Sequence, residues 1–233
     1  MLKKHIPNFI TLLNLFSGCM AIYFAMQANF EWFTYLIVLA AVFDYFDGLS
    51  ARLLGVYSRM GKELDSLADV VSFGVAPGFL VMSMLIERGL PLWITFVGFI
   101  IPLFSALRLA KFNNDERQTS TFLGLPTPAN AIFWAGISYG FSAFMIANLW
   151  LVFVLLAAMS LLLVSEIPMF SLKMKTLRIK SNLTQYLFLL VCVAILVFFK
   201  SKALAIIIAW YILFSIAIAI ASNVKTKKSF SRN

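Results

Sequence analysis

Apolar stretches long enough to cross a lipid bilayer dominate this chain. A membrane-spanning helix needs about 20 largely apolar residues. Eight stretches meet that length: 7–28, 32–54, 62–87, 91–110, 127–147, 149–170, 183–199 and 203–222. Hydrophobic residues make up 62% of the 233 residues and charged residues only 12%, and a soluble fold of this size has too little interior to hide so much apolar surface. The sequence therefore predicts an all-α, polytopic bundle of about eight transmembrane helices, forming one membrane domain over 1–233.

The basic residues are divided unevenly between the two sides of this predicted bundle. With the N-terminus in the cytoplasm, 16 of the 19 Lys and Arg residues fall in cytoplasmic segments, and only Arg88, Lys200 and Lys202 fall outside. Cytoplasmic loops of membrane proteins carry such an excess. We therefore expect both termini, including a basic tail at 223–233, on the cytoplasmic side of the plasma membrane. This bias accounts for the net charge of +9, which does not indicate a nucleic-acid partner.

The first apolar stretch has two interpretations. Lys3 and Lys4 precede an apolar run, as in a secretory signal, but Pro7 and Asn14 interrupt that run and no soluble domain follows it. We expect this stretch to be retained as the first span.

Four of the ten acidic residues fall within 26 positions, namely Asp44, Asp47, Asp65 and Asp69. Spacings of three and four place each pair on one helix face, and a short turn can bring the two pairs opposite each other. Carboxylates inside a membrane need compensation, and their oxygens suit Mg²⁺ or Mn²⁺. Two divalent cations would neutralise all four charges, and a two-metal site fits phosphoryl transfer. The alternative is a group of helix-end carboxylates solvated among lipid headgroups.

Small residues accompany the aspartates. Gly48, Ala51 and Gly61 lie on or beside the same predicted helix faces. Glycine lets a bulky phosphate approach the backbone, and small residues also let membrane helices pack closely. Both interpretations remain open from the pattern alone.

Written out, the acidic segment reads Asp44-x2-Asp47-Gly48-x2-Ala51-Arg52-x8-Gly61-x3-Asp65-x3-Asp69. This pattern resembles the signature of the CDP-alcohol phosphotransferase family, whose members are polytopic membrane enzymes. They move a phosphatidyl or related group from a CDP-linked lipid to an alcohol and release CMP. The resemblance implies that the four aspartates bind two divalent cations, Mg²⁺ or Mn²⁺, and that Asp69 is also the catalytic base. It further implies a homodimer.

The same resemblance implies a set of residues that contact the CDP-linked lipid. This set consists of Asn14, Gly48, Ala51, Arg52, Ser58 and Gly61. Asn14 belongs to the polar pattern Pro7-Asn8-x2-Thr11-x2-Asn14 on the first span. Taken alone, it is also typical of a hydrogen bond between membrane helices.

The acceptor alcohol has to be inferred from neighbouring stretches. Three of them resemble the branch of the family that uses serine, namely Asp65-Ser66-Leu67-Ala68-Asp69 with the following 70–77, Arg108-Leu109-Ala110-Lys111-Phe112-Asn113, and 122–130. Members that use glycerol 3-phosphate tend to have Pro after the third aspartate and Lys after the fourth. The similarity covers 6–131, the expected catalytic region, whereas 132–222 look like additional transmembrane helices. Lys111 stands where Arg is more usual, so the charge is kept and the planar fork is lost.

Four residues are acceptor-binding candidates. Arg108 or Lys111 can hold the carboxylate of an amino acid, and Asn113 and Thr127 can add hydrogen bonds. Without the motif, the two cations are typical of side chains that extend to the cytoplasmic membrane surface. The expected substrates are CDP-diacylglycerol and serine.

Two other functions remain open. The same chemistry on glycerol 3-phosphate or inositol phosphate uses the same signature. A cation transporter could use the acidic cluster as its ion site, but transporters often contain inverted repeats, and none is visible here.

Overall fold

The computed structural model describes residues 5–115, 122–170 and 182–230. Several basic residues on which the predicted orientation rests lie outside the described residues, namely Lys3, Lys4, Arg117, Lys173, Lys175, Arg178, Lys180 and Arg232. The last three residues of the predicted basic tail also lie outside.

The described chain is almost entirely helical. In chain order the helical elements are α1 (His5–Met26), α2 (Phe30–Leu54), α3 (Arg59–Asp69), the π-helical turn η2 (Val70–Val75), α4 (Ala76–Glu87), α5 (Leu92–Thr95), the 3₁₀ turn η3 (Phe96–Phe99), α6 (Ile100–Asn114), α7 (Thr127–Ala147), α8 (Leu149–Val164), α9 (Leu183–Phe199), the 3₁₀ turn η6 (Lys200–Lys202) and α10 (Ala203–Phe230). Two short strands, β1 (Phe122–Leu123) and β2 (Pro168–Met169), pair antiparallel. The predicted all-α class is confirmed.

Five segments of the described residues are long and apolar enough to cross a membrane. They are His5–Met26, Arg59–Glu87, Leu92–Asn114, Thr127–Ala147 and Leu183–Ala221, and α8 is a shorter apolar helix. The last segment contains α9 and most of α10, which pack against each other. Each of the eight predicted ranges contains a helix, whereas the number of membrane crossings and the side of the termini stay predictions.

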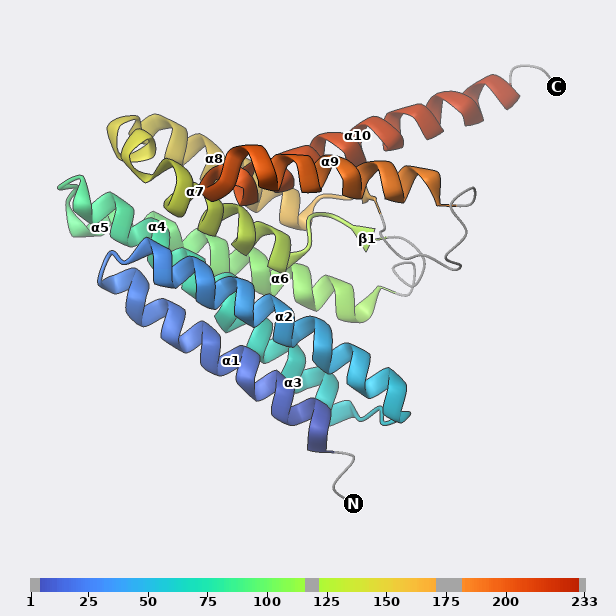
Figure 1. The fold of residues 1–233 in the computed structure, drawn as a ribbon, viewed down its shortest axis with the longest axis horizontal. Coiled ribbons are helices and arrows are strands. Elements are labelled where there is room, and N and C mark those ends of the chain that lie inside the picture. Colours follow the sequence, from blue (N-terminus) through green and yellow to red (C-terminus); the bar gives the residue numbers. More distant parts are fainter. Residues whose placement is uncertain (1–4, 116–121, 171–181, 231–233) are drawn as a thin grey trace.

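The helices form an elongated bundle with two distinct ends (Figure 1). The start of α1, the turn from α2 to α3, β1 and the start of α9 lie toward one end. The turn from α1 to α2, α5 and the turn from α7 to α8 lie toward the other. The aspartates therefore belong to the first end, because they flank the turn between α2 and α3.

The backbone of α1 lies very close to that of η2, in the third predicted span. A Cβ atom added to Gly18 would lie 2.7 Å from the Cα atom of Ser72 in η2. The Ser72 hydroxyl donates a 3.0 Å hydrogen bond to the carbonyl of Asn14. Small residues allow such contacts between membrane helices. The resulting interface fixes α1 beside the C-terminal end of α3, where Asp69 is the last residue.

Two of the predicted spans differ in detail from the structure. The helix predicted over 149–170 ends at Val164, because the chain turns into β2 and the backbone N–H of Gly124 donates to the carbonyl of Ile167. Pro168 lacks the N–H that a continuing helix needs. The third span is not a uniform α-helix, since η2 interrupts it directly after Asp69. A π-helical turn of this kind has no signature in the hydropathy pattern.

Candidate active site

A short connection brings the two pairs of aspartates together. Gly55 ends α2 in the left-handed conformation, with φ of 64°, and its N–H bonds back to the last turn of the helix. Ser58 then begins α3, where its hydroxyl accepts a 2.9 Å hydrogen bond from the N–H of Gly61. These two caps make the tight reversal that the sequence predicted between the second and third spans.

Three of the four aspartates form one cluster. Ligand oxygens of Asp44, Asp47 and Asp65 all lie within 4.8 Å of one another. The Oδ1 atom of Asp65 is buried and has no hydrogen-bond partner. Three carboxylates at this spacing repel each other unless a cation lies between them, and an unpartnered buried oxygen is the donor that such a cation needs. The residues present therefore fit a divalent metal ion.

Asp69 lies beside this cluster and is not one of its three members. Its side chain is 7% exposed, and its Oδ1 atom accepts a 3.3 Å hydrogen bond from the amide of Asn14. The carboxylate is close enough to Asp44 and Asp65 to be repelled by both. The four aspartates thus share one electrostatic environment, in which Asp69 has a separate hydrogen-bond partner.

Helix α1 contributes a residue that the sequence reasoning did not select. The Thr11 hydroxyl donates a 2.7 Å hydrogen bond to Oδ2 of Asp47, and it also bonds to the carbonyl of Pro7 at 3.1 Å. Thr11 is three residues before Asn14, so both side chains lie on one face of α1. That shared face of a polar pair inside an apolar helix was the signal available in the sequence.

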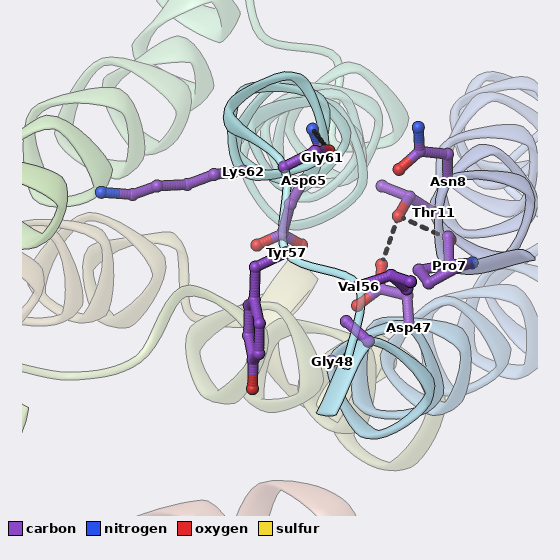
Figure 2. A pocket seen from close by; sticks show the side chains of 12 residues that line it. Pro7, Asn8, Thr11, Asp47, Gly48, Val56, Tyr57, Gly61, Lys62 and Asp65 are labelled. Carbon is purple, nitrogen blue, oxygen red and sulfur yellow. Dashed lines mark hydrogen bonds between the residues drawn. The ribbon is translucent and has the colours of Figure 1, made fainter. Parts of the chain in front are cut away.

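A cavity of about 180 Å³ opens between α1, α2 and α3 beside the cluster. Its lining consists of Pro7, Asn8, Thr11, Asp47, Gly48, Ala51, Val56, Tyr57, Ser58, Gly61, Lys62 and Asp65. Figure 2 shows Asn8 and Thr11 on one side of this cavity and Gly61 and Asp65 on another, whereas the Lys62 side chain extends away from them. The cavity therefore combines carboxylates, hydroxyls and bare backbone.

Four of the six residues expected to contact a CDP-linked lipid line this cavity, namely Gly48, Ala51, Ser58 and Gly61. Asn14 does not line it and instead bonds to Asp69. Arg52 does not line it either, because its Nε atom donates a 3.0 Å hydrogen bond to the carbonyl of Gly48 in its own helix. Arg52 is exposed, and its guanidinium lies 3.6 Å from a Cβ atom built on Gly48, a residue of the cavity lining.

The two glycines differ in the space around them. A Cβ atom added to Gly61 would lie 3.0 Å from the Ser58 hydroxyl and 3.1 Å from Oδ1 of Asn8. At Gly48 the nearest atom would be the guanidinium of Arg52, at 3.6 Å. Protein packing therefore accounts in part for Gly61, whereas at Gly48 the space is open and is part of the cavity wall.

The four acceptor-binding candidates have different surroundings. Arg108 is 7% exposed, and its guanidinium is attracted by Asp69 and Asp44. Thr127 is fully buried. Lys111 and Asn113 bond to groups other than the carboxylates: Lys111 bonds to the carbonyl of Val164 at 3.4 Å, and Asn113 bonds to the hydroxyl of Ser66, the residue after Asp65, at 2.8 Å. Arg108 is thus the cation of this group that lies near the carboxylates.

A family model described as CDP-alcohol phosphatidyltransferase matches residues 4–164. The chain belongs to this family. The match includes the acidic signature, the cavity and Arg108, and it ends with α8, so α9 and α10 lie beyond the part that defines a CDP-alcohol phosphatidyltransferase.

Several curated relatives of this CDP-alcohol phosphatidyltransferase carry the name CDP-diacylglycerol–serine O-phosphatidyltransferase. The chain is 34% identical to the protein of Mycobacterium leprae over 218 residues, covering 89% of this chain and 69% of the relative. It is 34% identical to that of Bacillus subtilis over 148 residues, covering 62% and 81%. It is 30% identical to that of Helicobacter pylori over 217 residues, covering 90% and 89%.

Family membership also answers one alternative that the pattern left open. A CDP-alcohol phosphatidyltransferase is an enzyme, so the acidic cluster does not require a transport function. Enzymes of this family generally depend on a divalent metal and act on a diphosphate. The carboxylate cluster could hold such a metal, and the adjacent cavity leaves space for a diphosphate.

Proposed function

We propose that this protein transfers a phosphatidyl group from CDP-diacylglycerol to the hydroxyl of L-serine, giving phosphatidylserine and CMP. The observation that carries the proposal is the carboxylate cluster of Asp44, Asp47 and Asp65 beside a glycine-walled cavity, in a chain whose curated relatives are named for this reaction. The buried cation Arg108 near the cluster suits an acceptor that carries a carboxylate.

The four aspartates are proposed to hold two divalent cations, Mg²⁺ or Mn²⁺. The unpartnered Oδ1 of Asp65 and the close spacing of the three clustered carboxylates support this assignment. When bound, the cations supply charge stabilisation for the diphosphate and for the CMP that leaves. Thr11 fixes the orientation of Asp47, because its hydroxyl occupies one of the two carboxylate oxygens.

Asp69 is proposed as the base that takes the proton from the serine hydroxyl. The hydroxyl oxygen forms the new bond to the phosphorus that carries the diacylglycerol, and the bond from that phosphorus to the CMP oxygen breaks. A carboxylate is a weak base, but it helps once the attacking hydroxyl has become acidic in the transition state. The hydrogen bond from Asn14 to Oδ1 leaves the other oxygen of Asp69 for this proton.

The CDP-linked lipid is proposed to lie in the cavity between α1, α2 and α3. Ser58 caps the Gly61 N–H, so the first turn of α3 leaves the N–H groups of Arg59 and Met60 without an acceptor in the helix, and the positive end of the helix dipole favours phosphate oxygens. Gly48 and Gly61 keep this wall free of side chains. Ser58, which lines the cavity, and Arg52, which lies beside Gly48, are proposed to contact the phosphates.

We further propose that the enzyme crosses the plasma membrane eight times as a homodimer, with both termini and the active site facing the cytoplasm. The excess of Lys and Arg on that side supports the orientation. The cytoplasm is also where serine and the CTP-derived nucleotide are found. Residues 6–131 would form the catalytic region and 132–222 the additional helices.

The test is an acceptor assay on the purified protein in detergent or liposomes. CDP-diacylglycerol and Mg²⁺ or Mn²⁺ are incubated with serine, glycerol 3-phosphate or inositol phosphate, and both CMP and the lipid product are measured. We expect CMP and phosphatidylserine with serine. CMP release with glycerol 3-phosphate and none with serine would reject the serine assignment while leaving the family chemistry intact.

A further inference from the structure

Helix α10 lies beyond the residues that the family model matches, yet it holds the chain that follows α8. Phe170 comes directly after β2. Its backbone N–H donates a 3.1 Å hydrogen bond to the Ser215 hydroxyl, and its carbonyl accepts a 3.1 Å hydrogen bond from the Tyr211 hydroxyl. Ser215 is four residues after Tyr211, so the two side chains lie on one face of α10 and bind both backbone groups of one residue.

Aromatic rings surround the same residue. The ring centroids of Phe170 and Phe214 on α10 are 5.1 Å apart with the ring planes perpendicular, and those of Phe170 and Phe188 on α9 are 5.6 Å apart. Ring pairs in such tilted arrangements add to the stabilisation that burial provides. The Ser215 side chain is also buried. Phe170 therefore connects β2 firmly to both C-terminal helices.

This connection extends to β1 through the antiparallel pair, in which Leu123 lies opposite Pro168. The chain after β1 stays on the same backbone, because the N–H of Gly124 donates a 2.9 Å hydrogen bond to the carbonyl of Ile167. Gly124 has φ of 74°, and a Cβ atom at this position would lie 2.6 Å from the carbonyl oxygen of Leu163. Only glycine fits here. The chain therefore has little freedom before α7 begins.

Helix α7 begins three residues after Gly124, at the level of the acidic cluster. The Thr34 hydroxyl of α2 donates a 3.0 Å hydrogen bond to the carbonyl of Ala135 in α7. From this contact, Asp44 is ten residues further along α2 and Thr127 is eight residues back along α7. At a rise of about 1.5 Å per residue, the two residues lie at nearly the same level. The position of β1 thus helps to fix where α7 begins relative to the carboxylates.

Tyr211 is also a neighbour of the buried cation of the candidate site. Its hydroxyl donates its one proton to Phe170, so its oxygen has only lone pairs left for other groups. Arg108 on α6 is close enough to interact electrostatically with this oxygen, as it does with Asp69. A residue of α10 therefore belongs to the surroundings of the positive charge that attracts the carboxylates.

We propose that Tyr211 is a positioning residue of the candidate active site, which acts through Phe170 on the start of α7 and through its oxygen on Arg108. The proposal rests on the proposed function, because it gives α9 and α10 a role in transfer to serine. These helices then align the side of the site that carries Arg108 and Thr127. The cavity between α1, α2 and α3 is built without them. Loss of the Tyr211 hydroxyl therefore impairs use of the acceptor and leaves binding of CDP-diacylglycerol unchanged.

The test is Tyr211→Phe, which keeps the ring and removes the hydroxyl. Tyr139→Phe is the matched control, because it removes a tyrosine hydroxyl from α7 that lies 3.5 Å from the Tyr35 hydroxyl, toward the other end of that helix. We expect kcat/KM for serine to fall by about 3- to 10-fold in Tyr211→Phe, the value of one neutral hydrogen bond. The KM for CDP-diacylglycerol and the Mg²⁺ or Mn²⁺ requirement should stay as in wild type. Equal kcat/KM for serine in the two variants overturns the proposal.

A second variant and a second measurement test the connection through Phe170. Ser215→Ala removes the acceptor of the Phe170 N–H and should also lower kcat/KM for serine. Backbone hydrogen exchange over residues 123–130 should become faster in Tyr211→Phe and Ser215→Ala and stay unchanged in Tyr139→Phe. Stabilisation of each variant by CDP-diacylglycerol against thermal unfolding reports that it is folded. Unchanged exchange in both α10 variants overturns the connection.

Failure of this proposal differs from failure of the proposed function. A wild-type protein that releases CMP with glycerol 3-phosphate and not with serine rejects the proposed function. A wild-type protein that uses serine, together with an unaltered Tyr211→Phe variant, rejects only the role of Tyr211.

Discussion

The Thr11 hydroxyl of α1 donates a 2.7 Å hydrogen bond to Oδ2 of Asp47 on α2. This bond ties the first helix to the acidic cluster and leaves Oδ1 of Asp47 for other partners. Thr11 also lines the cavity beside the cluster. A residue outside the acidic signature therefore takes part in shaping the candidate site.

Replacement of Thr11 should weaken the site without unfolding the protein. In Thr11→Val the side chain keeps its shape but cannot donate to Asp47, and loss of such an orienting bond typically costs about 10- to 100-fold in metal affinity or activity. Titration of activity with Mg²⁺ or Mn²⁺ measures the change. Ser17→Ala is the matched control on α1, because its hydroxyl bonds only within its own helix, to the carbonyl of Leu13. An equal effect of both variants would refute a specific role for Thr11.

Removal of one clustered carboxylate should change the metal requirement itself. Asp65→Asn keeps the size of the side chain but removes a charged ligand whose Oδ1 has no protein partner. We expect the Mg²⁺ or Mn²⁺ concentration for half-maximal CMP release to rise by about 10-fold or more. Glu63→Gln, an exposed position on the same helix, is the control and should behave as wild type. Chelation with EDTA should abolish wild-type activity, and a divalent cation should restore it. Activity that persists in EDTA would contradict the metal assignment.

Asp69 should affect turnover more than folding. In Asp69→Asn the side chain can still bond to Asn14, but it cannot accept the hydroxyl proton, so we expect kcat to fall by about 100-fold or more. The unfolding temperature should not fall, since the substitution removes a buried charge. Rapid-quench measurement of CMP formation with saturating substrates gives the rate of the chemical step. Wild-type turnover in this variant would remove the proposed base.

Two glycines should separate fold from function. At Gly18 an added Cβ would lie 2.7 Å from the Ser72 backbone, so Gly18→Ala should force α1 away from η2 and lower the unfolding temperature. At Gly48 the nearest atom is a flexible guanidinium at 3.6 Å, and Ala is the better helix former, so Gly48→Ala should fold at least as well as wild type. The methyl group nevertheless enters the cavity wall. We therefore expect a raised KM for CDP-diacylglycerol in Gly48→Ala, and an unchanged KM would remove Gly48 from the lipid site.

The sequence predicted the helical class and the approximate extent of each helix, because apolar length and charged turns are local properties of the chain. It also predicted that the aspartate pairs face each other, since helix periodicity and one short turn determine that geometry. It did not predict the π-helical turn η2 or the end of α8 at Val164. Both depend on contacts between distant segments, such as Gly18 with Ser72 and Gly124 with Ile167.

The sequence predicted only those residues of the candidate site that belong to the acidic signature, from Asp44 to Asp69. The signature leads to the aspartates and the small residues around them, and the structure brings three of the aspartates into one cluster. The polar pattern on the first span contains Asn8 and Thr11, but their partners and their place at the cavity depend on how α1 packs against α2 and α3. Lys111 and Asn113 share a motif with Arg108, yet Lys111 bonds to the carbonyl of Val164 and Asn113 bonds to the Ser66 hydroxyl, and the motif alone does not predict these partners.

The π-helical turn η2 lies between Asp69 and α4 and holds more residues per turn than an α-helix does. An α-helix advances by about 100° per residue, so the wider turn resets the angular phase of everything that follows. Helix α4, which follows η2, can then pack against α1 and α7, while the carboxylates of α3 still point toward α2. Deleting a single residue from 70–75 would return the span to regular winding and swing one part away from its partners. The span therefore consists of two helical parts with different angular phases, joined directly after Asp69, where the acidic site ends.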